Sequence, residues 1–422
     1  MKFFFGFVIS ASFFSSALFS FSFPIFAQSI YVLPGSNAGF GDLAWAVLVA
    51  KDLKAKRPHF NIKLLEPFDS IHPERKDIER DLAKLKILLG DDTSLEMISL
   101  KEGALKPADL IIAVSDFSAI PKNSAFSANE NLNRAGRDII TLSEYTHQNF
   151  HGPLDKTEQE DLQVSSSERL RLRIATGPFS FGMLSKPISL GPKIQFPDPR
   201  GREVTFVYSL GSDRGENFLR SFNDHLQENG KYGIAYTPYQ VEKSELPRVE
   251  LINLKGKSLN YSAQALQRAT TAVHVTGDIS LSFALQYDKV FSYAIPSWKR
   301  GMAYEIRSLF LQTRREEFQK RQQSYDSIFE WMSEYGMTPY SNAAEQTPEA
   351  VAAYKRGLKN MHSSAFMADF QSRLRAAKKV IPNISDRLPL LVDFVLGTNG
   401  DRPSPFTCRD FLRSLRTAGI KN

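Results

Sequence analysis

The chain has 422 residues, a length that favours two or three domains at a prior of about 150 residues each, and 42% of its residues are hydrophobic, as in globular proteins. Its formal charge of +7, from 53 Lys and Arg against 46 Asp and Glu, is spread along the chain, which argues against nucleic acid as a partner and suits an anionic ligand such as a nucleotide diphosphate. The single Cys408 excludes an internal disulfide and a cysteine-based zinc site.

The first 27 residues differ from the rest of the chain. Lys2 precedes an uncharged run rich in Phe and Ser, residues 3–26, and the small residue Ala27 follows it. This layout predicts a signal peptide, residues 1–27, cleaved before Gln28, and hence a secreted or periplasmic protein. Because the run is also about 24 residues long, a membrane anchor formed by residues 3–26 is the alternative.

A strand–helix–strand unit opens the mature chain. Residues 29–33 form a short apolar run that predicts a buried strand, and a glycine-rich turn follows it. Apolar residues recur at helical spacing over 43–56, Pro58 ends that helix, and 61–65 predicts the next strand. The alternation continues with a helix at 73–89 and strands at 110–114 and 139–142. We therefore expect a Rossmann-like domain over residues 28–195.

A second alternating series follows a Gly- and Pro-rich crossover, and its strands carry few polar residues. Strands are predicted at 204–210, 234–236, 249–254, 272–275 and 290–294, and helices at 217–226, 261–269 and from 277 onward. Strands this apolar are typical of a parallel sheet that is covered on both faces. A second Rossmann-like domain is therefore expected over residues 196–300.

The last part of the chain, residues 301–422, predicts helices only. Helical patterns are found at 300–325, 348–359, 365–379, 388–396 and 411–417. No strand candidate follows Ser297. The expected fold class is α/β, with two Rossmann-like parallel-sheet domains and a C-terminal helical appendage.

Two glycine-rich turns each join a predicted strand to a predicted helix. One contains Gly39 and Gly41, and the other contains Gly211 and Gly215. Free backbone N–H groups at such a turn, together with the positive end of the helix, form a site for phosphate. Neither turn matches the dinucleotide-binding or the P-loop pattern, and the alternative is that the glycines only permit tight turns.

A third segment, residues 275–285, has the order strand, Gly277 and Asp278 at a turn, then a helix. This segment resembles the donor-binding segment of GT-B-fold glycosyltransferases. The segment 204–217 is similar to the first strand and loop of their donor domain. The loop that holds Gly41 and Asp42 is similar to the acceptor-domain loop of one subgroup, the protein-arginine rhamnosyltransferases.

The resemblance implies roles for named residues. Asp42 is the candidate general base, and Asp278 is a second candidate catalytic carboxylate. The acceptor-side loop holds Gly39 and Gly41. Candidate donor-binding residues are Gly211, Ser212, Arg214, Gly277, Ser280, Lys299 and Arg300. Each has a simpler alternative, since carboxylates at helix starts stabilise their own helices, loop arginines are commonly solvated, and Lys299 with Arg300 can open a helix.

The implied function is sugar transfer without metal or cofactor. The donor would be nucleotide-activated or lipid-linked, and the acceptor a glycan or protein of the cell envelope. Two alternatives remain, an exported two-lobed ligand-binding protein without catalysis and a sugar epimerase. His274 lies inside an apolar strand, so we expect a buried, hydrogen-bonded imidazole there rather than a base or a metal ligand.

Overall fold

The computed structural model describes most of the chain between residues 29 and 396. The described ranges are 29–34, 40–66, 75–90, 93–98, 110–114, 138–143, 168–174, 182–208, 212–242, 244–296, 306, 337–340 and 348–396. The predicted signal peptide, the predicted helix at 411–417 and all but residue 306 of the predicted helix at 300–325 lie outside them. Within these ranges, no helix combines the length and apolar character needed to cross a bilayer.

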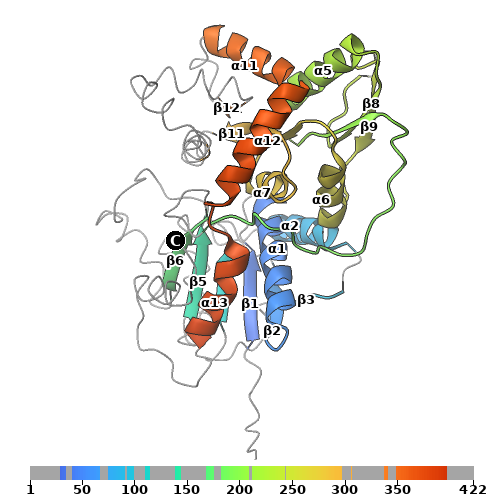
Figure 1. Cartoon of the computed structure of the whole chain (residues 1–422). Helices are drawn as coiled ribbons and strands as arrows, with labels where there is room; N and C mark the ends of the chain where they lie inside the picture. The colour runs from blue at the N-terminus through green and yellow to red at the C-terminus, as the bar shows by residue number, and fades with distance from the viewer. Residues whose placement is uncertain are drawn as a thin grey trace, which may run out of the picture.

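A six-stranded parallel sheet forms the first half of the molecule (Figure 1). Its strands are β1 (Ser29–Pro34), β2 (Asn61–Leu65), β3 (Glu96–Ile98), β4 (Leu110–Val114), β5 (Asp138–Ser143) and β6 (Glu168–Arg173). They lie in the order β3-β2-β1-β4-β5-β6, and every neighbouring pair is parallel. The central strands β1 and β4 are almost wholly buried, as their continuous apolar runs require.

Among the described residues, two helices connect strands of this sheet and differ in how much of their surface they bury. Helix α2 (Arg75–Leu89) is amphipathic and turns Leu85 and Leu88 into the core. Helix α1 (Phe40–Lys56) is buried from Leu43 to Leu53 on all sides. The reason is that α1 packs on β1, β2 and β4 and is also covered by helices from the second half of the chain.

The second half repeats the same strand order in two three-stranded parts. One part contains β7 (Glu203–Phe206), β8 (Gly233–Thr237) and β9 (Val249–Asn253), and the other contains β10 (Val273–Val275), β11 (Phe291–Pro296) and β12 (Met337–Tyr340). A parallel bridge between Val207 and His274 joins them, and the Tyr208 N–H donates to the His274 carbonyl at 2.8 Å. The resulting order is β9-β8-β7-β10-β11-β12, all parallel.

Three of the described helices lie between strands of this second sheet in the chain and pack on it. They are α5 (Ser212–Glu228), α6 (Leu259–Arg268) and α7 (Asp278–Gln286). The predicted fold class, α/β with two Rossmann-like parallel sheets and a helical C-terminal region, is confirmed. The prediction that no strand follows Ser297 is wrong, because β12 pairs with β11. This strand has four residues, contains Pro339 and lies at the sheet edge, where a missing N–H donor is tolerated.

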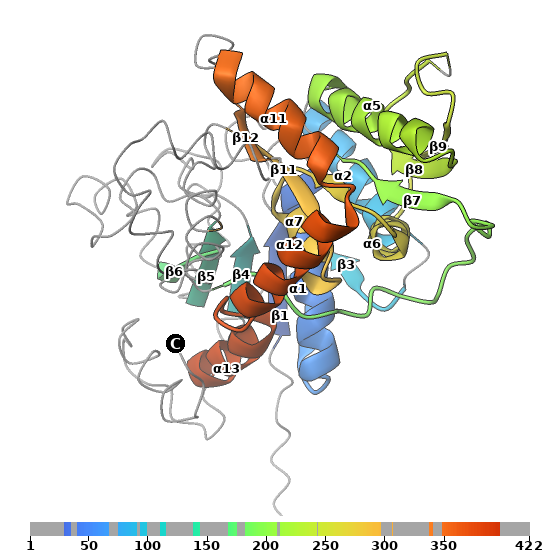
Figure 2. The same cartoon turned by 45° about the horizontal axis from the view of Figure 1, so that its top comes forward.

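The C-terminal helices bind the two halves together (Figures 1 and 2). Helix α11 (Pro348–Asn360) packs on α5, α12 (Ser364–Lys378) follows it, and α13 (Ile384–Leu396) returns to pack on α1 of the first half. The side chains of Arg57 and Asp393 form an ion pair across that junction, with Arg57 Nε 2.8 Å from Asp393 Oδ1.

The crossover between the two sheets also holds them in place. The backbone of Met183 exchanges hydrogen bonds with the segment before α13, accepting from Ile384 N–H at 3.1 Å and donating to Pro382 O at 2.9 Å. Lys51 Nζ on α1 donates to Leu190 O at 2.7 Å, and Gln286 Nε2 on α7 donates to Leu184 O at 3.0 Å. The crossover is therefore fixed to α1, α7 and α13 at once.

Candidate functional site

Both sheets have a point where the strand order reverses. In the first sheet it lies between β1 and β4, and in the second between β7 and β10. The chain leaves the carboxyl ends of these neighbouring strands in opposite directions, which opens a crevice between the loops, and ligands of parallel α/β sheets bind in that crevice. The glycine-rich segments singled out in the sequence follow β1, β7 and β10, so all three lie at reversal points.

At the reversal point of the first sheet, helix α1 begins. Gly41 and Asp42 are its second and third residues, because α1 begins three residues before the predicted helix at 43–56. Gly41 is exposed, and a Cβ atom built on it would meet nothing within 4 Å. The backbone of Asp42 is therefore in the first helical turn, while its side chain and the whole of Gly39 lie outside the described part of the chain.

At the reversal point of the second sheet, helix α7 begins after Gly277. The backbone of Gly277 has φ 78° and ψ 163°, a conformation that in practice only glycine adopts. A glycine at this position has no side chain to cap the helix, so the first-turn N–H groups receive no hydrogen bond from the N-cap residue. Such a helix start offers N–H donors and the positive end of the helix dipole to an anion.

The polar side chains beside Gly277 are buried. Asp278 is 2% exposed, and its carboxylate in the first turn is favourably placed for the helix dipole. The hydroxyl of Ser280 donates to Thr276 O inside the helix start, so only its oxygen lone pairs remain for a donor group of a ligand. Thr276 donates in turn to Ala294 O at 2.7 Å, which fixes the turn to β11.

Arg214, in the first turn of α5, brings positive charge to the same reversal point. Burial, and to a lesser extent the nearby Arg214 guanidinium, lower the pKa of His274 to about 3. Burial raises the pKa of Tyr354, from α11, to about 12, and the same guanidinium opposes that rise. Arg214 therefore lies close to two buried groups that stay neutral at pH 7.

His274 itself is part of the sheet interior. Its ring is fully buried, its Nδ1 lies 3.1 Å from Ser292 Oγ, and the ring stacks on Phe218 with 5.3 Å between centroids. The prediction of a buried, hydrogen-bonded imidazole is confirmed. The sequence analysis singled out neither Ser292 nor Tyr354. Tyr354 reaches this place only through the packing of α11 on α5, which no local sequence pattern predicts.

The two reversal points are brought together by direct helix packing. Helix α7 contacts α1, and Figures 1 and 2 show it beside the end of α1 at which the chain enters from β1. All nine residues of α7 are buried, as expected for a helix that packs on α1, α6 and β10 at once. The candidate residues on α1 and α7 therefore share one interdomain region.

Some candidate residues cannot be placed. Gly211, Lys299 and Arg300 lie outside the described residues, and of Ser212 the structure describes only the backbone, at the first position of α5. Within the described ranges, no group of three or more His, Cys, Asp or Glu side chains is arranged to hold a metal ion.

No protein-family model and no curated protein matches the chain. Solved structures with which it shares similarity include three glycosyltransferases, each superposed over most of both chains. The glycosyltransferase SnogD from Streptomyces nogalater is 11% identical, with 88% of this chain and 100% of that one covered and a TM-score of 0.48. The spinosyn forosaminyltransferase SpnP is 12% identical, with 87% of this chain and 99% of that one covered and a TM-score of 0.47. MurG from Acinetobacter baumannii is 9% identical, with 87% of this chain and 99% of that one covered and a TM-score of 0.43.

Proposed function

We propose that this protein is a glycosyltransferase that binds an activated sugar donor at the reversal point of the second sheet and an acceptor at that of the first. One observation carries the proposal. Two parallel sheets of identical strand order face each other through α1 and α7, the helices that start at the two reversal points. This arrangement suits a transferase, because donor and acceptor must meet in one place with defined geometry.

The second sheet supplies the donor site in this proposal. The diphosphate of the donor accepts hydrogen bonds from the first-turn N–H groups of α7, and Gly277 lets it approach the backbone closely. Arg214 and the helix end stabilise the negative charge that develops on the leaving diphosphate, a role that needs no metal ion. Burial keeps the His274 ring neutral at pH 7, so the ring adds no second positive charge beside the Arg214 guanidinium.

The first sheet supplies the base. An acceptor hydroxyl oxygen attacks the anomeric carbon of the donor sugar, and the bond from that carbon to the diphosphate oxygen breaks. The hydroxyl proton passes to the carboxylate of Asp42, and the diphosphate leaves with the electron pair of the broken bond. Asp278 remains the second candidate carboxylate, with its place in the first turn of α7.

The compartment sets the class of donor. If residues 1–27 direct export, as their composition predicts, the donor is lipid-linked or reaches the enzyme after export, and the acceptor is a glycan or protein of the envelope. If residues 3–26 instead stay in the membrane, the protein is anchored there.

The test is an assay of the full chain for sugar transfer from a panel of activated donors, both nucleotide-activated and lipid-linked. Asp42→Asn is expected to lower turnover about 100-fold or more while leaving donor affinity within a factor of two, because general-base catalysis contributes that much to rate and little to binding. Asp224→Asn, at an exposed aspartate of α5, is the matched control and leaves turnover unchanged. Donor affinity with no turnover for any activated sugar would instead identify a binding protein.

A further inference from the structure

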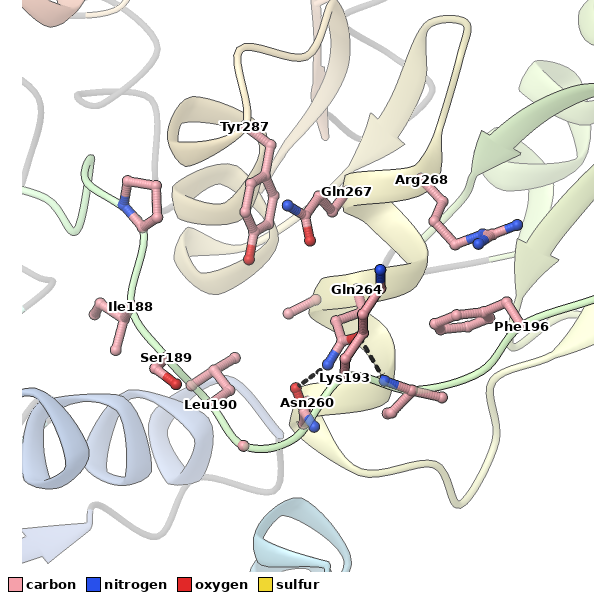
Figure 3. A pocket seen from close by; sticks show the side chains of 14 residues that line it. Ile188, Ser189, Leu190, Lys193, Phe196, Asn260, Gln264, Gln267, Arg268 and Tyr287 are labelled. Atoms are coloured by element: carbon pink, nitrogen blue, oxygen red, sulfur yellow. Dashed lines mark hydrogen bonds between the residues drawn. The ribbon is translucent and has the colours of Figure 1, made fainter.

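A separate cavity of about 450 Å³ lies on the other side of α7 (Figure 3). Its walls are the crossover from Pro187 to Phe196, helix α6, and Tyr287 at the carboxyl end of α7. Gly277 and Tyr287, which flank α7, are ten residues and hence about 15 Å apart at 1.5 Å per residue, so this cavity is distinct from the site at Gly277. Its volume is within the range of about 300–1,000 Å³ that is typical of small-molecule sites.

The walls of this cavity are fixed by hydrogen bonds before any ligand binds. The side chains of Asn260 and Gln264, one helical turn apart on α6, both donate to Pro192 O at 2.9 Å. Gln264 also accepts from the Ile194 N–H at 2.8 Å. The crossover is thus clamped along a rigid helix, which lowers the ordering cost of binding.

Part of the cavity lining is apolar, and all the charged side chains of the lining are positive. Ile188, Leu190 and Phe196 supply the apolar surface, and none of the fourteen lining residues is acidic. Lys193 and Arg268 are the two cations of the lining. A site with this composition favours an anion and disfavours a cation of the same shape.

Arg268 and the groups near it are held in position. The Arg268 guanidinium donates to Pro197 O at 3.0 Å and lies 5.2 Å from the centre of the Phe196 ring, and its buried Nε has no hydrogen-bond partner. Figure 3 shows Gln267 and Tyr287 turned toward one another from α6 and α7, with the exposed Lys193 rising beside α6. Polar groups therefore border one side of the apolar lining.

We propose that this cavity binds a small organic anion, an aryl or acyl compound with one phosphate or carboxylate group. Its apolar body lies against Ile188 and Leu190, and its anionic group lies toward Lys193 and the polar ends of Gln267 and Tyr287. The proposal does not depend on sugar transfer. An occupant would contact the crossover, α6 and α7 together, three elements that connect the two sheets.

The experiment is calorimetric titration of the full chain with phenyl phosphate and with benzoate, which separates phosphate from carboxylate recognition. Binding of at least one of them is expected, and benzylamine, of similar shape and opposite charge, is not expected to bind. Lys193→Met is expected to weaken that binding by about tenfold, since a charge-assisted hydrogen bond is lost. Gln267→Trp, at an exposed position of α6 that lines the cavity, fills the space and is expected to abolish binding.

The matched control is Lys255→Met, at an exposed lysine outside the cavity, which leaves affinity unchanged. The proposal is overturned if neither anion binds, if benzylamine binds as tightly, or if Lys193→Met and Lys255→Met have the same effect. It is also overturned if a nucleoside diphosphate displaces the bound anion by competition, since that result would place both ligands at Gly277.

Discussion

A single backbone conformation at Gly277 sets the direction in which α7 leaves β10. With φ at 78° and ψ at 163°, any other residue is strained there even though a Cβ would meet no atom within 4 Å. Gly277→Ala is therefore expected to lower the free energy of unfolding by about 1–3 kcal/mol. Urea denaturation of the full chain measures this change.

Gly41 provides the matched control for that substitution, because it too has open space at the Cβ position but lies inside helix α1 with an ordinary helical backbone. Gly41→Ala is expected to leave stability unchanged or to raise it by up to about 1 kcal/mol, the difference in helix propensity. Equal losses for the two variants would contradict a backbone origin of the effect.

Two buried histidines make the folded chain sensitive to acid. His362, between α11 and α12, is 2% exposed and stacks on His225 at 5.2 Å, and burial followed by the charge of His225 lowers its pKa to about 3, like that of His274. The unfolded chain thus binds more protons than the folded one between about pH 6.5 and pH 3. The free energy of unfolding has its full value above about pH 6.5 and decreases as the pH is lowered towards 3. At pH 5 each histidine has lowered it by about 2 kcal/mol.

A substitution at His362 tests this directly, since its ring lies among Phe218, Phe222 and His225 and neither ring nitrogen has a hydrogen-bond partner. His362→Phe is expected to shrink the difference in unfolding free energy between about pH 7.5 and about pH 5 by about 2 kcal/mol. His59→Phe, at an exposed position, is the comparison and leaves that difference unchanged. An unchanged difference in His362→Phe would contradict the burial of a neutral ring.

At the scale of elements, α13 belongs to the first half of the molecule although it is last among the described elements. Arg57, directly after α1, donates to Asp393 on α13 through Nε, at 2.8 and 3.0 Å from the two carboxylate oxygens, and also through Nη2. Both side chains are less than a quarter exposed. Asp393→Asn is expected to cost about 1–2 kcal/mol, as loss of a forked, charge-assisted pair does.

A second ion pair of α13, made with the crossover, is the control for that prediction. Lys186 and Asp386 are 63% and 41% exposed, so water screens their attraction. Lys186→Ala is expected to change stability by no more than about 0.5 kcal/mol. If it costs as much as Asp393→Asn, the junction of α1 and α13 owes little to the buried pair.

Sequence reasoning located the elements of the sheet interiors and missed the edges. The strands β1, β2 and β4 were predicted almost to the residue, because strands covered on both faces must be apolar throughout. Three short or polar strands, β3, β6 and β12, were not predicted. All three are edge strands, with one neighbour each and no need for a continuous apolar run.

The candidate site was predictable where it depends on local chain geometry. Gly277 and Arg214 were singled out because a glycine-rich turn between strand and helix is a local pattern, and the structure has them at the starts of α7 and α5; their roles in a site stay predictions. The return of α13 to α1, the approach of Tyr354 to Arg214 and the cavity at the crossover were not found. Each depends on contacts between segments far apart in the chain, which no local pattern records.

At the scale of the whole molecule, two sheets with the same strand order face each other. Three contacts among the described helices hold them together. Helix α7 packs on α1, α6 packs on α2, and α13 crosses back from the second half to the first. The crossover runs between the two sheets and is fixed to α1 and α7. The two reversal points therefore share one interdomain region, which we propose as the binding region.

The most direct test is a titration of the full chain with a panel of nucleoside diphosphates, followed by thermal unfolding. A ligand of the second reversal point is expected to stabilise the wild-type chain by about 2.7 kcal/mol at one hundred times its Kd. Arg214→Met is expected to lose most of that gain, and Arg220→Met, at an exposed arginine of the same helix, to keep it. The account is contradicted if no nucleoside diphosphate raises the Tm, or if the two variants respond alike.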